Sequence, residues 1–265
     1  MIHSLLNSIH ELLGRSRRLT RAAVLLRNQC TQVIRSGLAP SASQSENGET
    51  LLIDAVAAHV KRAVDVGAHL GGWAAPLLTA AEDAQILMFE PQPEYAARLR
   101  ERFGSRTEVV EAALGDRPGY ATLFGGDVPT HASLVDEVGT AIGQVVVSTL
   151  DIEAEKRDWS NIDFVKIDSE GFDLHVLRGA SGLLAGQRIG IVQFEYNRQW
   201  MHAGSTLTAA RAFLAQHGYD VYLVRYDGLY EFDYKRFGEF FTYSNFVAIS
   251  PQASSWIDHL RRGAY

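Results

Sequence analysis

The stretch Ala63-Val64-Asp65-Val66-Gly67-Ala68-His69-Leu70-Gly71 decides the fold of this chain. Residues 63–66 are a short apolar run that predicts a buried strand, and Gly67 permits the sharp turn that ends it. A helical segment is predicted at residues 73–81 and a second strand at residues 85–90. A strand, a glycine turn, a helix and another strand in this order are typical of a parallel sheet.

The same alternation continues along the chain. Further strands are predicted at residues 107–113, 145–147, 164–167, 189–194, 219–224 and 246–249, and helices at 51–60, 93–103, 172–180 and 206–217. Short apolar strands that alternate with helices predict an α/β fold with a mainly parallel sheet covered on both faces.

Composition excludes several classes of protein. The 265 residues are 46% hydrophobic and 21% charged, which is ordinary for a globular protein and excludes global disorder or a fibrous chain. The single cysteine, Cys30, excludes an internal disulfide and a cysteine-rich metal site. No apolar run approaches 18 residues, so no transmembrane segment is expected. These features predict a soluble, cytoplasmic protein.

Charge separates the start of the chain from the rest. Residues 1–40 carry six arginines and one acid, a net charge of +5, and the other residues carry −11, which together give −6. An acidic body argues against nucleic acid as a ligand. Helical spacing of apolar residues predicts two amphipathic basic helices in residues 1–40. They could pack on the main domain, form a homo-oligomer or lie on a membrane surface. Residues 41–50 are expected to be a linker, followed by the main domain at 51–265.

Acidic residues recur where the predicted strands end. They are Asp65, Glu90, Asp116, Asp168 and Glu195. A single acid at such a place is often a helix cap or a turn residue. In open α/β sheets, however, ligands bind beyond the carboxyl ends of the strands, so the recurrence indicates a site at this edge.

The glycine loop favours a nucleoside-type cofactor without a pyrophosphate. Aligned with the dinucleotide pattern G-x-G-x-x-G, the chain has His69 in place of the middle glycine, which disfavours NAD. Glu90 follows Gly67 by 23 residues, at the end of the next strand, where a carboxylate can accept both ribose hydroxyls. The alternatives are a purely structural turn and a helix cap formed by Glu90 after Pro91.

Five segments carry a resemblance to a known family. They are residues 63–71, 89–91 (Phe-Glu-Pro), 113–115 (Ala-Leu-Gly), 148–151 (Ser-Thr-Leu-Asp) and 162–171 (Ile-Asp-Phe-Val-Lys-Ile-Asp-Ser-Glu-Gly). The chain resembles the FkbM-type methyltransferases over roughly residues 60–250. The resemblance implies a class I Rossmann-like fold that uses S-adenosylmethionine (SAM), with a seven-stranded sheet whose last strand is antiparallel. His69 stands where that family often has asparagine.

The resemblance also implies roles for individual residues. The cofactor-binding residues would be Asp65, Gly67, Ala68, His69, Gly71, Glu90, Pro91, Ala113, Leu114 and Asp168. Among them, Asp65 would face the ammonium group of SAM and Glu90 its ribose. Ala113 and Leu114 would flank the adenine, and Asp168 would lie near the methyl group and the acceptor.

Transfer of a methyl group to a hydroxyl needs a base within hydrogen-bond reach. Asp168 and Glu195 are the candidates at strand ends; His202 is a third, with a plain surface histidine as its alternative. Asp168, Glu195 and Asn197 could instead hold Mg²⁺, although we expect a metal-free carboxylate base.

The sequence thus predicts a SAM-dependent methyltransferase. Its expected acceptors are hydroxyl groups of small molecules, sugars, glycosides or natural-product intermediates. Two rival functions stay open: an NAD-dependent oxidoreductase or epimerase, and a non-catalytic scaffold that binds a partner through residues 1–40. Aromatic residues crowd the last third of the chain and could stack on an acceptor or fill the core.

Overall fold

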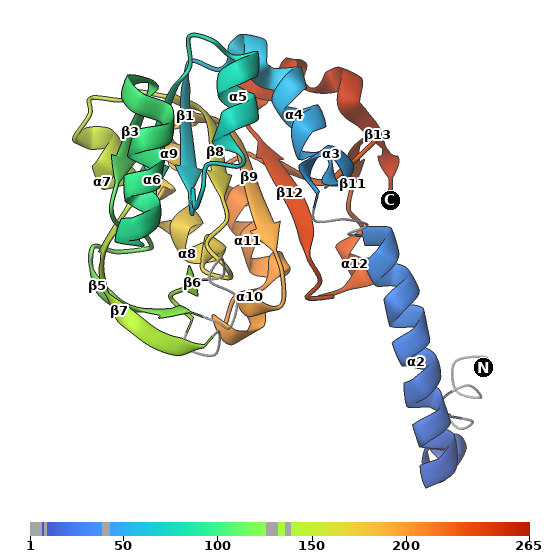
Figure 1. Ribbon diagram of the computed structural model, residues 1–265. Helices are drawn as coiled ribbons and strands as arrows, with labels where there is room; N and C mark the ends of the chain where they lie inside the picture. The colour runs from blue at the N-terminus through green and yellow to red at the C-terminus, as the bar shows by residue number, and fades with distance from the viewer. Residues whose placement is uncertain (1–6, 8–9, 39–42, 126–131, 136–138) are drawn as a thin grey trace. The chain divides into compact units, whose positions relative to one another are not determined.

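The computed structural model describes residues 7, 10–38, 43–125, 132–135 and 139–265 (Figure 1). The chain divides into two compact units, residues 1–40 and 41–265. In the first unit, residues 10–14 are helical and helix α2 spans Arg17–Leu38, as the spacing of apolar residues predicts. Most of the apolar residues that predict the first helix lie outside the described residues. No described helix has the length and apolar character needed to cross a bilayer.

The second unit is built on a mixed sheet of nine strands. Its order is β13 (Arg261–Ala264), β11 (Gly228–Glu231), β10 (Asp220–Arg225), β12 (Ser244–Ile249), β9 (Ile189–Tyr196), β8 (Ile162–Ile167), β1 (Arg62–Val66), β2 (Gln85–Phe89) and β3 (Thr107–Val110). Strands β3, β2, β1, β8 and β9 are parallel, and β12 runs antiparallel to both its neighbours. Among the seven strands from β3 to β10 in this order only β12 is reversed, which confirms the predicted seven-stranded sheet. Strands β11 and β13, which run in the direction of β12, extend the sheet beyond it.

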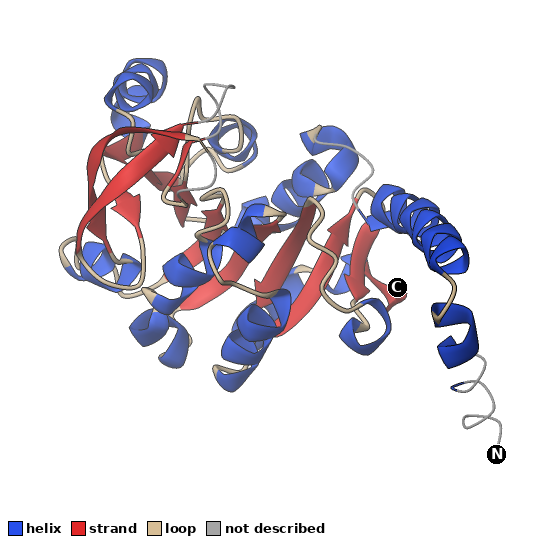
Figure 2. Cartoon of the chain, turned by 90° about the horizontal axis from the view of Figure 1, so that it is seen from below, coloured by secondary structure: helices blue, strands red, loops and turns tan. Residues whose placement is uncertain are grey.

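Helices cover both faces of this sheet (Figure 2). On one face lie α4 (Glu49–Val56), α5 (Ala74–Ala80) and α6 (Pro93–Phe103), whose buried side chains join the strands in one hydrophobic core. On the other lie α7 (Leu150–Glu155), α8 (Asp173–Arg178), α9 (Ser181–Ala185) and α11 (Leu207–Gln216). The predicted helices at 51–60, 73–81, 93–103, 172–180 and 206–217 all form, within a few residues of their expected ends.

A second, four-stranded sheet corrects the sequence-based description of residues 107–148. Its order is β4 (Ala113–Leu114), β7 (Thr140–Ser148), β5 (Gly119–Gly125) and β6 (Ala132–Ser133). The predicted strand at 107–113 divides between the two sheets, and residues 145–147 belong to β7 instead of the main sheet. The apolar run at 145–147 locates a strand, but it does not show which sheet that strand joins. The other residues of this sheet were missed because residues 140–144 of β7 and the start of β5 are exposed and form no continuous apolar run.

The expected linker at 41–50 is also partly wrong. Residues 44–47 form the short helix α3 (Gln44–Asn47), and α4 begins at Glu49. Between them Gly48 has a left-handed backbone (φ +93°), and an added Cβ would collide with the carbonyl oxygen of Arg225. This close approach to β10 fixes the position of Glu49, which is buried.

Candidate functional site

The strand order reverses between β1 and β8, and the candidate site lies at that point. From β1 the chain proceeds outward through β2 and β3, then returns to the other side of β1 as β8. In open α/β sheets such a switch point is where ligands bind, beyond the carboxyl ends of the strands. Two adjoining cavities lie here, and four residues line both of them: Gly67, His69, Asp168 and Glu170.

The first cavity has an apolar wall and one buried acid. It is lined by Val66, Gly67, His69, Phe89, Glu90, Pro91, Gln92, Ala113, Leu114, Leu123, Ala132, Ser133, Leu134, Asp168, Ser169, Glu170 and Phe172. Leu123, Ser133 and Leu134 come from or adjoin the second sheet, which sequence analysis did not foresee. An apolar slot with a few placed polar groups suits a flat heterocycle joined to a polar group.

Glu90, which lines this cavity, connects the loop after β1 to the loop after β2. Its Oε2 accepts a hydrogen bond from the backbone N–H of His69 at 2.9 Å, and its Oε1 accepts one from that of Gln92 at 2.9 Å. Burial raises the pKa of Glu90 above its ordinary value. Since Gln92 is the N-cap residue of α6, the helix-capping interpretation is partly right. A carboxylate has about four lone-pair sites, so both oxygens can still accept a ribose hydroxyl.

The two glycines of the loop, Gly67 and Gly71, are required for different physical reasons. Gly67 has φ +79°, and an added Cβ would collide with the carbonyl oxygen of Asp168 on the neighbouring strand end. The closeness of β1 and β8 therefore requires this glycine, in addition to any approach of a ligand. Gly71 lines neither cavity; an added Cβ there would meet the ring of Phe103 in α6. Of the predicted cofactor residues, Gly71 is the one that the structure assigns to helix packing.

The second cavity is polar and mostly acidic. It is lined by Gln44, Glu49, Asp65, Gly67, Ala68, His69, Gly72, Trp73, Lys166, Asp168, Glu170, Glu195, Asn197, Arg198, Gln199, Phe241 and Tyr243. Its carboxyl groups come from β1, β9 and α4, together with the loop after β8. The prediction that Asp168 and Glu195 end adjacent parallel strands is confirmed by the register of β8 and β9.

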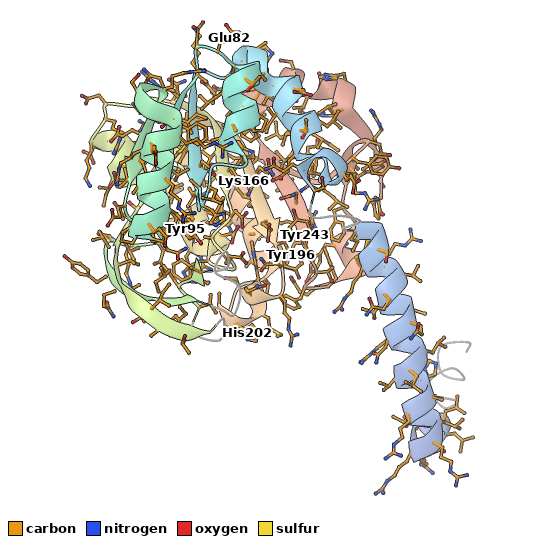
Figure 3. The ribbon with its side chains drawn as sticks, viewed as in Figure 1. Glu82, Tyr95, Lys166, Tyr196, His202 and Tyr243 are labelled. Atoms are coloured by element: carbon orange, nitrogen blue, oxygen red, sulfur yellow. The ribbon has the colours of Figure 1, made fainter. Side chains whose placement is uncertain are left out.

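Lys166 is the central charge of this cavity, and sequence analysis gave it no role. Its Nζ lies 3.2 Å from Oδ2 of Asp168 and 3.8 Å from Oε1 of Glu49. Burial alone would lower the pKa of Lys166, but the two carboxylates outweigh it and hold that pKa above its ordinary value. Figure 3 shows Lys166 in the middle of the unit, with Tyr243 near it. A lysine inside an otherwise apolar strand was the available signal.

Glu49 reaches the cavity from outside the strands. Its Oε1 accepts a hydrogen bond from Nε2 of Gln193 at 2.6 Å, and its Oε2 accepts one from Nδ2 of Asn47 at 3.2 Å. Nδ2 of Asn47 also contacts the hydroxyl of Tyr243 at 2.9 Å. Helices α3 and α4 therefore close one side of the cavity with a fixed polar network.

Asp65 is a buried acid with an unused oxygen. It is 2% exposed, and its Oδ2 has no hydrogen-bond partner among the described atoms. Burial raises the pKa of Asp65 to about 7, although Lys166 opposes this. Nε1 of Trp73, in the same cavity, likewise has no partner in the described part of the chain. Buried polar atoms are rarely left in this state, so both indicate a missing polar ligand.

Three more acids in or next to the second cavity have pKa values above the ordinary range for a carboxyl group. Burial, with the nearby charge of Asp168 as the next cause, raises the pKa of Glu170 and of Glu195. The same causes raise the pKa of Asp173 to about 7, and its Oδ1 accepts a hydrogen bond from the N–H of Glu195 at 3.3 Å. Oε1 of Glu195 accepts a hydrogen bond from Nδ2 of Asn197 at 2.8 Å.

His202 lies outside both cavities. It ends α10 (Gln199–His202) and lines a separate shallow depression with Phe172 and residues of the second sheet. Figure 3 shows it at the lower end of the unit, away from Lys166. The structure does not bring this third candidate base to Asp168 and Glu195: Trp200 of the same short helix turns inward and is fully buried, whereas His202 lines the separate depression.

The aromatic residues of the last third of the chain have both of the roles that the sequence allowed, since some fill the core and others line the second cavity. Tyr196, Phe240 and Phe246 pack together in the core, and Phe241 and Tyr243 line the second cavity. Tyr226 is 58% exposed. Of the eleven aromatic residues between positions 219 and 246, four are buried in the core and the other seven are partly or fully exposed; the buried ones are Tyr219, Tyr222, Phe232 and Phe246.

Few side-chain oxygens in this site are available to bind a divalent cation. In the described part of the chain, no three His, Cys, Asp or Glu side chains are grouped so as to hold a metal. Of the three residues considered for Mg²⁺, Asp168 is paired with Lys166, and Asn197 turns its amide nitrogen to Glu195 and its oxygen to the N–H of Gln199.

This fold and these cavities define a Rossmann-like α/β protein of the class I methyltransferase type. Residues 65–221, more than half of the chain, match the model of the FkbM methyltransferase domain, and the chain belongs to that family. It is 27% identical over 160 residues to the 2-O-methyltransferase NoeI of Sinorhizobium fredii, a match that covers 53% of this chain and 65% of that protein.

Two solved structures are also similar to this chain, at lower sequence identity. A precorrin-6y C5,15-methyltransferase from Geobacter metallireducens is 14% identical, with a TM-score of 0.41 over 75% of this chain and 86% of that one. The cofactor-bound protein Rv0187 from MTB is 17% identical, with a TM-score of 0.44 over 94% and 95% of the two chains.

Proposed function

We propose that this protein transfers the methyl group of SAM to a hydroxyl oxygen of a small molecule or glycoside. One observation carries the proposal: Asp168 lines both cavities, the apolar one that suits a nucleoside and the acidic one beside it. A carboxylate at the junction can reach both the end of the cofactor and an incoming acceptor. The similarity to a 2-O-methyltransferase supports oxygen as the accepting atom.

The residues of the first cavity fit SAM. Glu90 would accept hydrogen bonds from the ribose hydroxyls, and Ala113, Leu114 and Phe172 would pack against the adenine. Asp65, which lines the adjoining second cavity, would face the ammonium group with its unused buried oxygen. When bound, SAM supplies an electrophilic methyl group on a sulfonium. The main task of the protein is then to hold the acceptor oxygen in line with that methyl.

At the acceptor end of the site, the carboxyl groups of Asp168 and Glu195 would have different roles. Asp168, ion-paired with Lys166, would take the proton of the acceptor hydroxyl on a carboxylate oxygen. Glu195, whose pKa is raised by burial and by the nearby charge of Asp168, would donate a hydrogen bond to the acceptor in its protonated form. Lys166 and Glu49 would act as positioning residues that fix Asp168. The Lys166 ion pair and the turned amide of Asn197 favour this metal-free base over the Mg²⁺ alternative.

Two experiments test the proposal. Calorimetric titration with SAM, S-adenosylhomocysteine and NAD should show binding of the first two only; binding of NAD alone would establish the oxidoreductase alternative, and binding of none would favour a scaffold. Transfer of labelled methyl from SAM should then be screened over neutral sugars, glycosides and phenols. Asp168→Asn should strongly lower transfer to any acceptor found, and the exposed control Asp220→Asn should not. EDTA should leave the rate unchanged; loss of turnover that Mg²⁺ restores would establish the metal alternative.

A further inference from the structure

Helix α2 carries an exposed apolar stripe. Leu19, Leu26 and Val33 repeat at seven-residue intervals along it and are 49%, 66% and 74% exposed. At 100° per residue, the small residues Ala22, Ala23 and Cys30 fall on the same side, and all three are exposed. A helix that presents such a stripe to water normally has a partner that covers it.

The opposite side of α2 is cationic. Arg17, Arg21 and Arg35 lie roughly opposite the stripe, and Arg18 and Arg27 lie on its two flanks. Residues 17–38 include no aspartate or glutamate, and Glu11 is the only acid in residues 1–40. The partner must therefore offer an apolar surface and negative charge together.

We propose that α2 lies flat on a lipid bilayer that contains anionic headgroups. Nucleic acid would neutralise the arginines but leave the stripe in water. A second copy of α2 would cover the stripe, but it would bring together two helices with five arginines each and no acid to pair with them. An anionic bilayer satisfies both requirements, because acyl chains cover the stripe and headgroups surround the arginines.

The arginines also determine how the helix meets the bilayer. Its 22 residues would extend about 33 Å, the thickness of a bilayer core, but five arginines in that length exclude a spanning orientation. The helix lies instead in the interfacial plane, with the long arginine side chains extending from its sides to the headgroups. This binding is reversible and depends on salt and on lipid charge.

Vesicle flotation of the full chain, under reducing conditions, tests the proposal. Vesicles of phosphatidylcholine with 30% phosphatidylglycerol should carry the protein upward at low salt, and pure phosphatidylcholine should not. Arg17→Gln with Arg21→Gln should weaken binding about 25-fold, because each arginine near an anionic surface contributes about 1 kcal/mol, or about fivefold. The matched control, Arg117→Gln with Arg178→Gln on exposed sites of the second unit, should bind like the wild type.

The apolar stripe is tested separately. Leu26→Gln with Val33→Gln should also abolish flotation, whereas Ile142→Gln, at an exposed site on β7, should not. Retained SAM binding in each variant would show that the second unit is folded. Failure of the wild type to float with anionic vesicles overturns the proposal. Equal flotation of the wild type and the stripe variant does so too. If the wild type does not float but forms a concentration-dependent dimer, and the stripe variant does not form that dimer, the apolar stripe binds a second copy of the chain.

Discussion

The unused carboxyl oxygen of Asp65 leads to a quantitative prediction about cofactor binding. Its pKa is about 7 because the group is buried, so in the unliganded protein it carries a proton over much of the neutral range. If the carboxylate faces the ammonium of SAM, binding must remove that proton. The affinity for SAM should then fall as the pH drops below 7, by up to tenfold per pH unit, or about 1.4 kcal/mol.

The expected change can be worked out between pH 7.5 and pH 5.5. With a free pKa of about 7 and a bound pKa below this range, the dissociation constant should rise roughly 25-fold, or about 2 kcal/mol. The upper limit stays below the ordinary pKa of an α-amino group, about 7.7–8.0, so the ligand keeps its charge. At pH 7, roughly half a proton should be released for each SAM bound.

Calorimetry in two buffers with different enthalpies of ionisation measures both quantities. S-adenosylhomocysteine has the same ammonium group but no sulfonium charge, so it should show the same pH dependence. Asp65→Asn should flatten the profile. The matched control is Asp173→Asn: the pKa of Asp173 is also raised to about 7, but it lines neither cavity, so its replacement should leave the profile intact. A flat wild-type profile, or one that Asp65→Asn does not alter, would refute the assignment.

Four further outcomes are expected. Glu90→Ala should weaken SAM binding by about 1–3 kcal/mol in calorimetry, since two hydrogen bonds to a charged group are lost; unchanged affinity in a folded protein would falsify the ribose assignment. Asp168→Asn should lower turnover ~10²–10⁴-fold with SAM affinity little altered, and an equal loss of both would indicate a structural role. Because native Asp65 and Asp173 bind protons that the unfolded chain has released, the unliganded protein should lose stability from pH 5 to pH 7. Thermal melts check that sign. Deletion of residues 1–40 should leave SAM affinity within severalfold, and a folded truncation that no longer binds SAM would contradict the division into units.

The main sheet could be predicted because its strands are buried on both faces. Val64, Leu87 and Val165 are each at most 1% exposed, and such positions produce continuous apolar runs that sequence analysis detects. The glycine turn and Glu90 could be located for a related reason, since both stand immediately after such a run. Their neighbours in space follow from the parallel order of the strands.

The second sheet and the side of the site formed by α4 could not be predicted. Strand β5 mixes exposed and partly buried residues, and residues 140–144 of β7 are exposed, so these sequences do not separate the strands from loops; the apolar run at 145–147 does not show which sheet it joins. Glu49 precedes Lys166 by 117 residues, and no local pattern connects them. Only the left-handed Gly48, held against β10, brings that carboxylate into the cavity.

Buried charge identifies the site more directly than any motif. In register across the sheet, Asp65, Lys166 and Gln193 lie side by side on β1, β8 and β9, each no more than 3% exposed. Burial of such groups is costly unless they are paired, and a fold selected for stability alone would have apolar side chains in this row. The polar row instead lies next to Ala63 and Phe164 of the apolar core, on the side of the carboxyl ends of the strands. A lysine that breaks an apolar run two residues before a strand-end acid is therefore a physical indicator of a site, because the cost of its burial is offset only where charge is used.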